Sequence, residues 1–286
     1  MGTMAMLPSF TRILLVTDFS DCSEAAVPFV RLMAECYGAS VVAAHIITGA
    51  TTEAATEAAP HEAGALQGAA EVQMRRFLAR NALGEVPVET IIERGSVADV
   101  LAPLIQKQGI DLVVVGTHGR SGVGKLLLGS VAQRIFNVVP CPVLSVSPRA
   151  AKAPGAAEKF ARILYPTDFS EVSLVALPYA LSLAKIEGSA LILLHAASEP
   201  PRHEVLQEYY RRLNALIPQE ARAWCKSDAL VSVGDPVEAI LQAAAEQNAD
   251  CIVISAHRAE GTFNVPLTTA YQVVAHAPCP VLRLRS

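Results

Sequence analysis

Short apolar runs alternate with longer segments of helical spacing along the whole chain. The runs are too short for helices and rich in β-branched residues and leucine, which is typical of strands buried on both faces. In the first half the predicted strands are 13–16, 41–47, 86–93, 111–115 and 143–146, and the predicted helices are 24–36, 71–81, 97–108 and 130–139. Gly38 and Gly109 follow two of these helices as expected C-caps, and Pro87 favours an edge position for the third strand. The pattern predicts an α/β fold with a doubly wound, five-stranded parallel sheet, Rossmann-like in architecture.

The chain contains this pattern twice. The stretch Arg12–Ser20 (RILLVTDFS) returns 150 residues later as Arg162–Ser170 (RILYPTDFS), and Pro140–Leu144 returns 138 residues later as Pro278–Leu282. We therefore predict two tandem domains, 1–148 and 161–286, joined by a linker at 149–160. Because the offset decreases along the chain, the second copy lacks about eleven residues opposite 49–70, which we expect to be a mobile loop.

Composition narrows the class of protein. The 286 residues suit about two domains, and a net charge of −4 excludes a strongly basic nucleic-acid-binding protein. No apolar run is long enough for a membrane helix, and the first residues show no basic region followed by an apolar stretch, so we expect neither a membrane span nor a signal peptide. Six cysteines without a CxxC pair favour reduced, buried thiols and a cytoplasmic location.

A glycine-rich segment follows the fourth predicted strand. Residues 116–129 contain five glycines and lead into a predicted helix. Glycine permits close backbone approach, and a helix N-terminus attracts anions, so a phosphate chain fits such a loop. The alternative is a loop whose glycines only form turns. A P-loop is disfavoured because Leu126 stands where Ser or Thr would hold Mg²⁺.

The spacing Gly116-x2-Gly119-x9-Gly129-Ser130 resembles the nucleotide loop of the universal stress protein family. The strand signature Val16–Ser20 and the last-strand motif Cys141–Leu144 agree with the resemblance, which covers nearly the whole chain as two tandem domains of the adenine nucleotide alpha hydrolase-like type. The resemblance implies an adenine-nucleotide site for ATP, or ADP or AMP, with Mg²⁺ as an optional companion. The residues that it implies are Val16, Thr17, Asp18, Ile46, Gly116, Gly119, Arg120, Gly129, Ser130 and Val131.

The resemblance also implies roles on the base side of this site. Asp18 would accept a hydrogen bond from the ribose or the adenine, and the alternative is a helix-capping role. Ile46 would meet adenine through its backbone groups. His45 is interpreted as a packed histidine at a strand end rather than a catalyst. Arg120 is a candidate charge partner for phosphate, with a solvated arginine as the alternative.

On the phosphate side, Gly116 and Gly119 would let the loop approach the ribose and phosphates. Gly129, Ser130 and Val131 would offer amides, and Ser130 a hydroxyl as well. The corresponding residues of the second copy are Ser255, Arg258, Thr268 and Thr269. Because all three glycines are replaced, we predict that the second copy does not bind ATP. Asp168 and Ala196 preserve its base-side half, which leaves a smaller or different ligand open.

The helix after each loop begins with a capping-box pattern, Ser130-x-x-Gln133 in the first copy and Thr269-x-x-Gln272 in the second. In the family the last strand pairs across a two-fold axis. Here the segments 143–146 and 281–284 are expected to pair within one chain as a pseudo-dimer. Association into a homodimer stays open.

Three functions remain. The favoured one is a nucleotide-binding stress sensor or regulator in which ATP or AMP orders the loop for a protein partner. The second is a slow ATPase or a nucleotide-dependent transferase, which would need a magnesium ligand and a base. His118 is the only plausible base, and it is interpreted as facing solvent, so no catalytic residue and no metal ligand is assigned. The third is a scaffold with a vestigial site.

Overall fold

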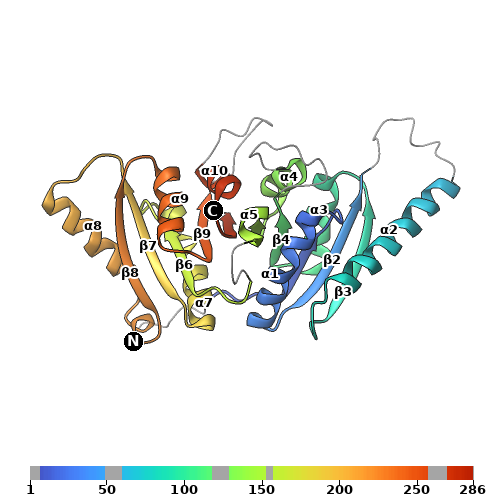
Figure 1. Cartoon of the computed structure of the whole chain (residues 1–286), viewed down its shortest axis with the longest axis horizontal. Coiled ribbons are helices and arrows are strands. Elements are labelled where there is room, and N and C mark those ends of the chain that lie inside the picture. The colour runs from blue at the N-terminus through green and yellow to red at the C-terminus, as the bar shows by residue number, and fades with distance from the viewer. Residues whose placement is uncertain (1–6, 49–59, 118–128, 153–156, 257–268, 286) are drawn as a thin grey trace. The chain divides into compact units, whose positions relative to one another are not determined.

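The computed structural model describes residues 7–48, 60–117, 129–152, 157–256 and 269–285 (Figure 1). Its contacts divide the chain into two compact units. Residues 10–148 form what we call the N-terminal unit, and residues 149–286 together with 1–9 form the C-terminal unit. Pro8 contacts the second of these, because its carbonyl accepts a hydrogen bond from the Ser182 hydroxyl at 2.5 Å.

The N-terminal unit is a five-stranded parallel sheet in the order β3-β2-β1-β4-β5. Its strands are β1 Arg12–Val16, β2 Ser40–Ile47, β3 Val88–Arg94, β4 Leu112–Gly116 and β5 Val143–Val146. Its helices are α1 Asp21–Tyr37, α2 Pro60–Arg80, α3 Val97–Gln108 and α4 Ser130–Val138. The strand order reverses between β1 and β4, which in doubly wound sheets marks the usual ligand position.

The C-terminal unit repeats this arrangement with the strand order β10-β9-β6-β7-β8, again parallel. Its strands are β6 Arg162–Pro166, β7 Ala190–Ala197, β8 Lys226–Val233, β9 Cys251–Ala256 and β10 Val281–Arg285. Its helices are α6 Glu171–Leu174, α7 Leu177–Glu187, α8 His203–Ala215, α9 Pro236–Glu246 and α10 Thr269–His276, with the 3₁₀ turn η2 Ala221–Ala223 before β8. One further short helix, α5 Pro148–Ala151, begins at the last residue of the first predicted domain and extends into the stretch predicted as the linker.

The predicted fold class is confirmed, because each unit is a doubly wound parallel sheet with β3 or β8 at one edge. The apolar runs of β1 and β4 are buried as predicted. Gly38 and Gly109 adopt the left-handed conformation (φ 66° and 63°) and end α1 and α3. In this position glycine avoids the steric cost that a Cβ would add.

Two local predictions were wrong. Residues 60–70, expected within a mobile loop, form the first half of α2, which begins eleven residues before Glu71. Their high alanine content supports a helix, although only Ala70 is buried among residues 64–70. The rest of that predicted loop, residues 49–59, lies outside the described residues. The predicted capping box is also absent, because Gly129 is the N-cap residue of α4 and Ser130 is already its first helical residue.

The six cysteines all lie among the described residues, and all are free thiols. Three are buried (Cys225, Cys251 and Cys279) and three are half-buried (Cys22, Cys36 and Cys141). Burial raises the pKa of the Cys251 thiol to about 12. This thiol therefore stays protonated and unreactive at neutral pH. No helix among the described residues is long and apolar enough to span a membrane.

Candidate functional site

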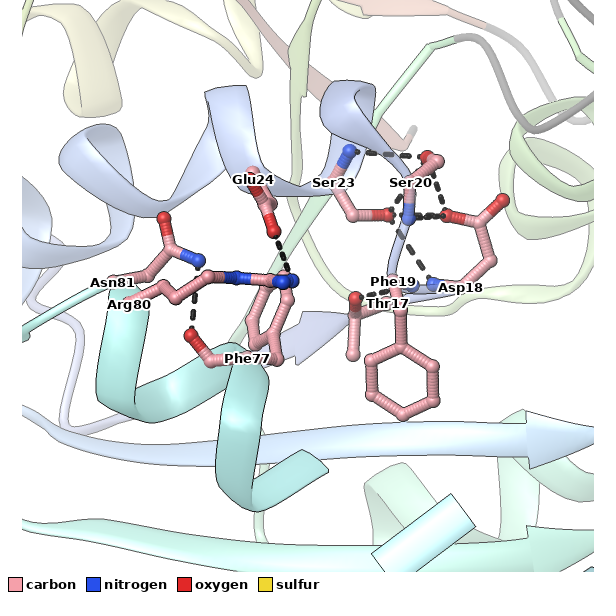
Figure 2. Close-up of polar contacts among 9 residues, drawn as sticks. All are labelled: Thr17, Asp18, Phe19, Ser20, Ser23, Glu24, Phe77, Arg80 and Asn81. Carbon is pink, nitrogen blue, oxygen red and sulfur yellow. Dashed lines mark hydrogen bonds and ion pairs between the residues drawn. The ribbon is translucent and has the colours of Figure 1, made fainter. Parts of the chain in front are cut away.

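The turn between β1 and α1 is built around the Asp18 carboxylate (Figure 2). Its Oδ1 accepts hydrogen bonds from the Ser20 amide (3.0 Å), the Ser20 hydroxyl (2.5 Å) and the Ser23 hydroxyl (2.6 Å). Ser20 itself is the N-cap of α1, and its hydroxyl accepts from the Ser23 amide at 3.4 Å. Asp18 therefore positions the N-cap residue Ser20 but is not itself the N-cap of α1. Its second carboxylate oxygen points away from the two serines (Figure 2).

Phe19 holds this turn against the sheet. It adopts the left-handed conformation (φ 62°), which is uncommon for a residue with a side chain. Its amide donates to the Thr17 hydroxyl at 2.9 Å. The centroid of its ring lies 4.3 Å from the ring centroid of His45 and 5.9 Å from that of Phe77. His45 places Nδ1 2.8 Å from the Thr17 carbonyl oxygen. His45 thus fastens the turn to β2, which agrees with its interpretation as a packed histidine.

The end of β2 presents backbone groups to the same turn. The Thr17 amide donates to the Ala44 carbonyl at 2.9 Å, and the Gly95 amide donates to the Ile47 carbonyl on the opposite side of β2. Because alternate residues of a parallel strand face alternate neighbours, the amide and carbonyl of Ile46 face the β1 side. There β1 has already ended and the chain turns away at Asp18. The ligand role that the resemblance implies for the Ile46 backbone stays a prediction.

Gly116 ends β4 beside the first turn of α1. A Cβ on Gly116 would lie 2.4 Å from the Cys22 carbonyl oxygen and 2.8 Å from its carbon. Real Cβ atoms do not approach backbone atoms so closely, so packing alone requires glycine here. The ligand role that the resemblance implies for Gly116 stays a prediction, and the structure adds a reason for the glycine that the sequence interpretation did not consider.

The start of α4 lies next to the end of β4. The Gly129 amide donates to the Thr117 carbonyl at 2.7 Å, and the Thr117 amide donates to the Val146 carbonyl at 2.9 Å. The first helical bond runs from the Gln133 amide to the Gly129 carbonyl at 2.9 Å. Gly129 has no side chain to accept from the amides of residues 130–132, and these amides carry the positive end of the helix dipole.

The structure thus brings most of the predicted site residues to one edge of the sheet. Ile46 and Gly116 lie at the carboxyl ends of β2 and β4, and Asp18 follows the end of the adjacent strand β1. Gly129 precedes α4. Val16 and Thr17 are buried behind the turn, whereas Val131 is exposed on α4. Gly119 and Arg120 lie outside the described residues.

Comparison with known proteins explains the repeat. The family model described as "Universal stress protein family" matches residues 9–147 and, a second time, residues 159–285. The chain belongs to the universal stress protein family.

Its relatives include both tandem and single-domain proteins. A universal stress protein of Mycolicibacterium smegmatis is 26% identical over 292 residues, which cover 96% of each chain. A universal stress protein of Thermus aquaticus is 32% identical over 146 residues, which cover 48% of this chain and 98% of that protein. The crystal structure of a universal stress protein from Archaeoglobus fulgidus superposes with a TM-score of 0.77 at 20% identity, covering 96% of this chain and 98% of its own. This likeness supports the tandem α/β fold.

The second domain of this universal stress protein contains a cavity of about 310 Å³ at the matching place. Seven of its lining residues are counterparts of predicted site residues, namely Pro166, Thr167, Asp168, Ala196, Ser255, Thr269 and Ala270. Burial by itself would raise the pKa of the Asp168 carboxyl, but hydrogen bonds from the hydroxyl and amide of Ser170 and from Ser173 lower it below its ordinary value. Asp168 is therefore an ionised acceptor at neutral pH. Arg258 and Thr268 lie outside the described residues.

Sequence reasoning missed two residues that hold the site together, Ser23 and Phe19. A signal for both was present, because the segment TDFSDCS at 17–23 returns as TDFSEVS at 167–173. In the second copy Ser173 lies 2.9 Å from the Thr167 hydroxyl, and the ring of Phe169 (φ 63°) packs 4.6 Å from that of His195. No cluster of three His, Cys, Asp or Glu side chains suited to a metal ion occurs within the described residues.

Proposed function

We propose that this universal stress protein binds an adenine nucleotide, ATP in the first place, in its N-terminal unit. The observation that carries the proposal is the convergence of three kinds of group where the strand order reverses. They are the backbone edge at Ile46, the Asp18 carboxylate and the N-terminus of α4. Each suits a different part of one ligand.

On the base side, the Ile46 backbone supplies one donor and one acceptor, which match the donor and acceptor on the edge of an adenine ring. The Asp18 carboxylate accepts from ribose hydroxyls through the oxygen that faces away from Ser20 and Ser23. Because its other oxygen is held by three donors, the carboxylate is oriented before the ligand arrives.

On the phosphate side, the amides of Ser130 and Val131 lie in the first turn of α4, where an anion is favoured. Because the N-cap residue Gly129 has no side chain to accept from these amides, phosphate oxygens can accept from them instead. In this proposal the bound nucleotide, with Mg²⁺ where the triphosphate carries it, sets a state of the protein that a cytoplasmic protein partner reads.

Calorimetric titration tests the proposal with ATP, ADP, AMP and cyclic AMP, each with and without Mg²⁺. We expect one site per chain for ATP, and Gly129→Arg should abolish it. The backbone of Gly129 (φ −58°) is accessible to any residue, so arginine blocks the amides without straining the turn. Gly68→Arg is the matched control, because a Cβ on Gly68 meets nothing within 4 Å.

The same samples are then assayed for phosphate release over hours. Slow release or none supports a sensor. Turnover above about one per second, ordinary for enzymes, would replace the sensor with an ATPase. Failure of the wild-type protein to bind any adenine nucleotide would overturn the site assignment.

A further inference from the structure

A cavity of about 480 Å³ lies in the N-terminal unit, at the amino ends of β2 and β3. One wall is the end of α1, from Arg31 to the C-cap Gly38, and the other is the segment 84–87 that leads into β3. The volume lies within the range of about 300–1,000 Å³ that is typical of binding pockets. Asp18 follows the carboxyl end of β1, at the opposite end of the sheet, so an occupant of this cavity would not compete with a nucleotide.

The C-terminal unit has a longer segment of its own chain at the corresponding place. The ends of α2 and α8 match, because the side-chain amides of Asn81 and Asn214 donate to carbonyls four residues earlier at 2.9 Å and 2.8 Å. A leucine stands two residues after each asparagine, and Val88 and Ser227 each pair with the second residue of the neighbouring strand. Between these points lie four residues (84–87) in the N-terminal unit and ten residues (217–226) in the C-terminal unit. The longer segment contains η2 and Trp224.

Trp224 lies next to the end of α7. The Lys185 ammonium lies 5.7 Å from the centroid of the Trp224 ring, which is within reach of a cation–π interaction. The side chains of Ile217, Ala221 and Cys225 are buried, so the segment is packed onto its unit. The C-terminal unit thus shows that this end of the fold accommodates an indole ring together with a cation.

The corresponding positions are acidic in the N-terminal unit. Glu85 stands at the strand register of Trp224, and Glu35 stands at the position of Lys185. Arg31 donates from Nε to a Glu35 carboxylate oxygen at 2.7 Å, and the two side chains are 52% and 49% exposed. Among the described residues that line the cavity, two carboxylates therefore stand beside one guanidinium. This balance favours an occupant that carries positive charge.

Small residues leave room for a flat ring between these charges. Ala34 and Ala39 line the cavity with single methyl groups, and a Cβ on Gly38 would meet nothing within 4 Å. Pro87 adds apolar surface from the opposite wall. A ring between these walls would also be able to stack on the Arg31 guanidinium, which favours aromatic faces.

We infer that this cavity is the docking site for a segment of a protein partner that presents a tryptophan with basic residues on both sides. The indole lies between the end of α1 and the segment 84–87, and the basic side chains pair with the two glutamates. The chain's own segment in the C-terminal unit has this composition, because Arg222 and Lys226 flank Trp224. The segment 84–87 is too short to fill the same place. The inference does not depend on nucleotide binding.

Fluorescence anisotropy tests the inference with a labelled peptide that has the sequence of residues 216–226 with Cys225→Ser. Titration with the full chain should show saturable binding at one site per chain. Trp224→Ala in the peptide should weaken binding at least about tenfold, because a buried aromatic anchor is lost. Arg222→Glu together with Lys226→Glu should weaken binding about fivefold, because two exposed charge pairs become repulsive.

Two variants of the chain locate the peptide. Glu85→Trp places an indole at the register of Trp224 and should weaken peptide binding at least about tenfold, while circular dichroism reports a folded chain. Glu93→Trp is the matched control, because Glu93 is an exposed glutamate of β3 outside the cavity lining, and it should change the affinity less than about twofold. Peptide binding that is unchanged in Glu85→Trp would overturn the inference, as would equally tight binding of the Trp224→Ala peptide.

Sedimentation of the wild-type chain distinguishes a protein partner from a second copy of this chain. The inference predicts a monomer, or an oligomer that Glu85→Trp leaves intact. A homodimer that dissociates in Glu85→Trp would make Trp224 of a second copy the occupant and would contradict the inference. Titration with ATP tests the nucleotide site separately.

Discussion

The two units of this universal stress protein join the first helix to the sheet in different ways. In the N-terminal unit Gly116 lets the Cys22 carbonyl approach β4, and α1 runs unbroken from Asp21 to Tyr37. In the C-terminal unit Ser255 stands in the place of Gly116 and donates to the Val172 carbonyl, and the corresponding helix is split into α6 and α7.

The split follows from side-chain donors that the first unit lacks. Tyr165, which replaces Leu15, is fully buried, and its hydroxyl donates to the Ser173 carbonyl at 3.0 Å. The carbonyls of Val172 and Ser173 accept their backbone bonds from residues three positions later, as in a 3₁₀ turn. Proline alone does not break the helix, because Pro28 lies inside the continuous α1. Two hydroxyls at the sheet therefore decide how this helix begins.

The largest expected effect comes from removing the glycine of the N-terminal junction. Gly116→Val should destabilise the N-terminal unit by about 3 kcal/mol, near the upper end of overpacking costs, because its Cβ would collide with the Cys22 carbonyl. Urea unfolding, monitored by far-ultraviolet circular dichroism, measures the change in the free energy of unfolding. Gly68→Val is the control for replacing a glycine by valine. If both variants lose the same free energy of unfolding, the collision with the Cys22 carbonyl is not the cause.

The second-largest effect is expected at alkaline pH, where the stability of the C-terminal unit should depend on the ionisation of Tyr165. Burial raises the pKa of Tyr165 from 10.0 to about 12. Since this pKa is higher in the folded state, its contribution is complete below pH 10 and is lost as the pH rises toward 12. One pKa unit corresponds to about 1.4 kcal/mol, so the loss is on the order of 2 kcal/mol. Tyr165→Phe should flatten the stability of the C-terminal unit between pH 10 and 12, and an unchanged slope would contradict this account.

A smaller effect is expected for Ser255→Ala. This variant removes the hydroxyl that bonds to the Val172 carbonyl, and should cost the C-terminal unit about 1 kcal/mol. Hydrogen exchange at α6 and α7 should increase along with the loss. Ser198→Ala, at an exposed serine after β7, is the matched control. Unchanged exchange in Ser255→Ala would show that this bond does not hold the split helix.

The smallest effect is expected for the ion pair between Arg80 and Glu24, drawn in Figure 2, which joins α2 to α1 at 2.6 Å. The C-terminal unit has leucine at the position of Glu24. Because the Arg80 side chain is 62% exposed, Arg80→Ala should change the free energy of unfolding by less than about 0.5 kcal/mol. A loss above about 1 kcal/mol would mean that surface charge contributes to the difference between the units.

The sequence predicted the repeated sheets well because each strand is a short apolar run and each motif occurs twice. It did not predict the start of α2, because residues 64–70 bury only Ala70 and show little helical periodicity. It placed the cap of α4 one residue late, since the pattern from Ser130 to Gln133 does not reveal that the Gly129 amide is tied to the Thr117 carbonyl. It also could not reveal the packing reason for Gly116, because Cys22 is remote in the sequence.

The central claim is that ATP binds in the N-terminal unit and not in the C-terminal one. Photocrosslinking of the full chain with an azido derivative of ATP, followed by peptide mapping, tests it most directly. The account predicts labelled peptides only from residues 10–148, with labelling lost in Gly129→Arg and retained in Asp168→Asn. Labelled peptides from residues 149–286 that persist in Gly129→Arg would contradict it.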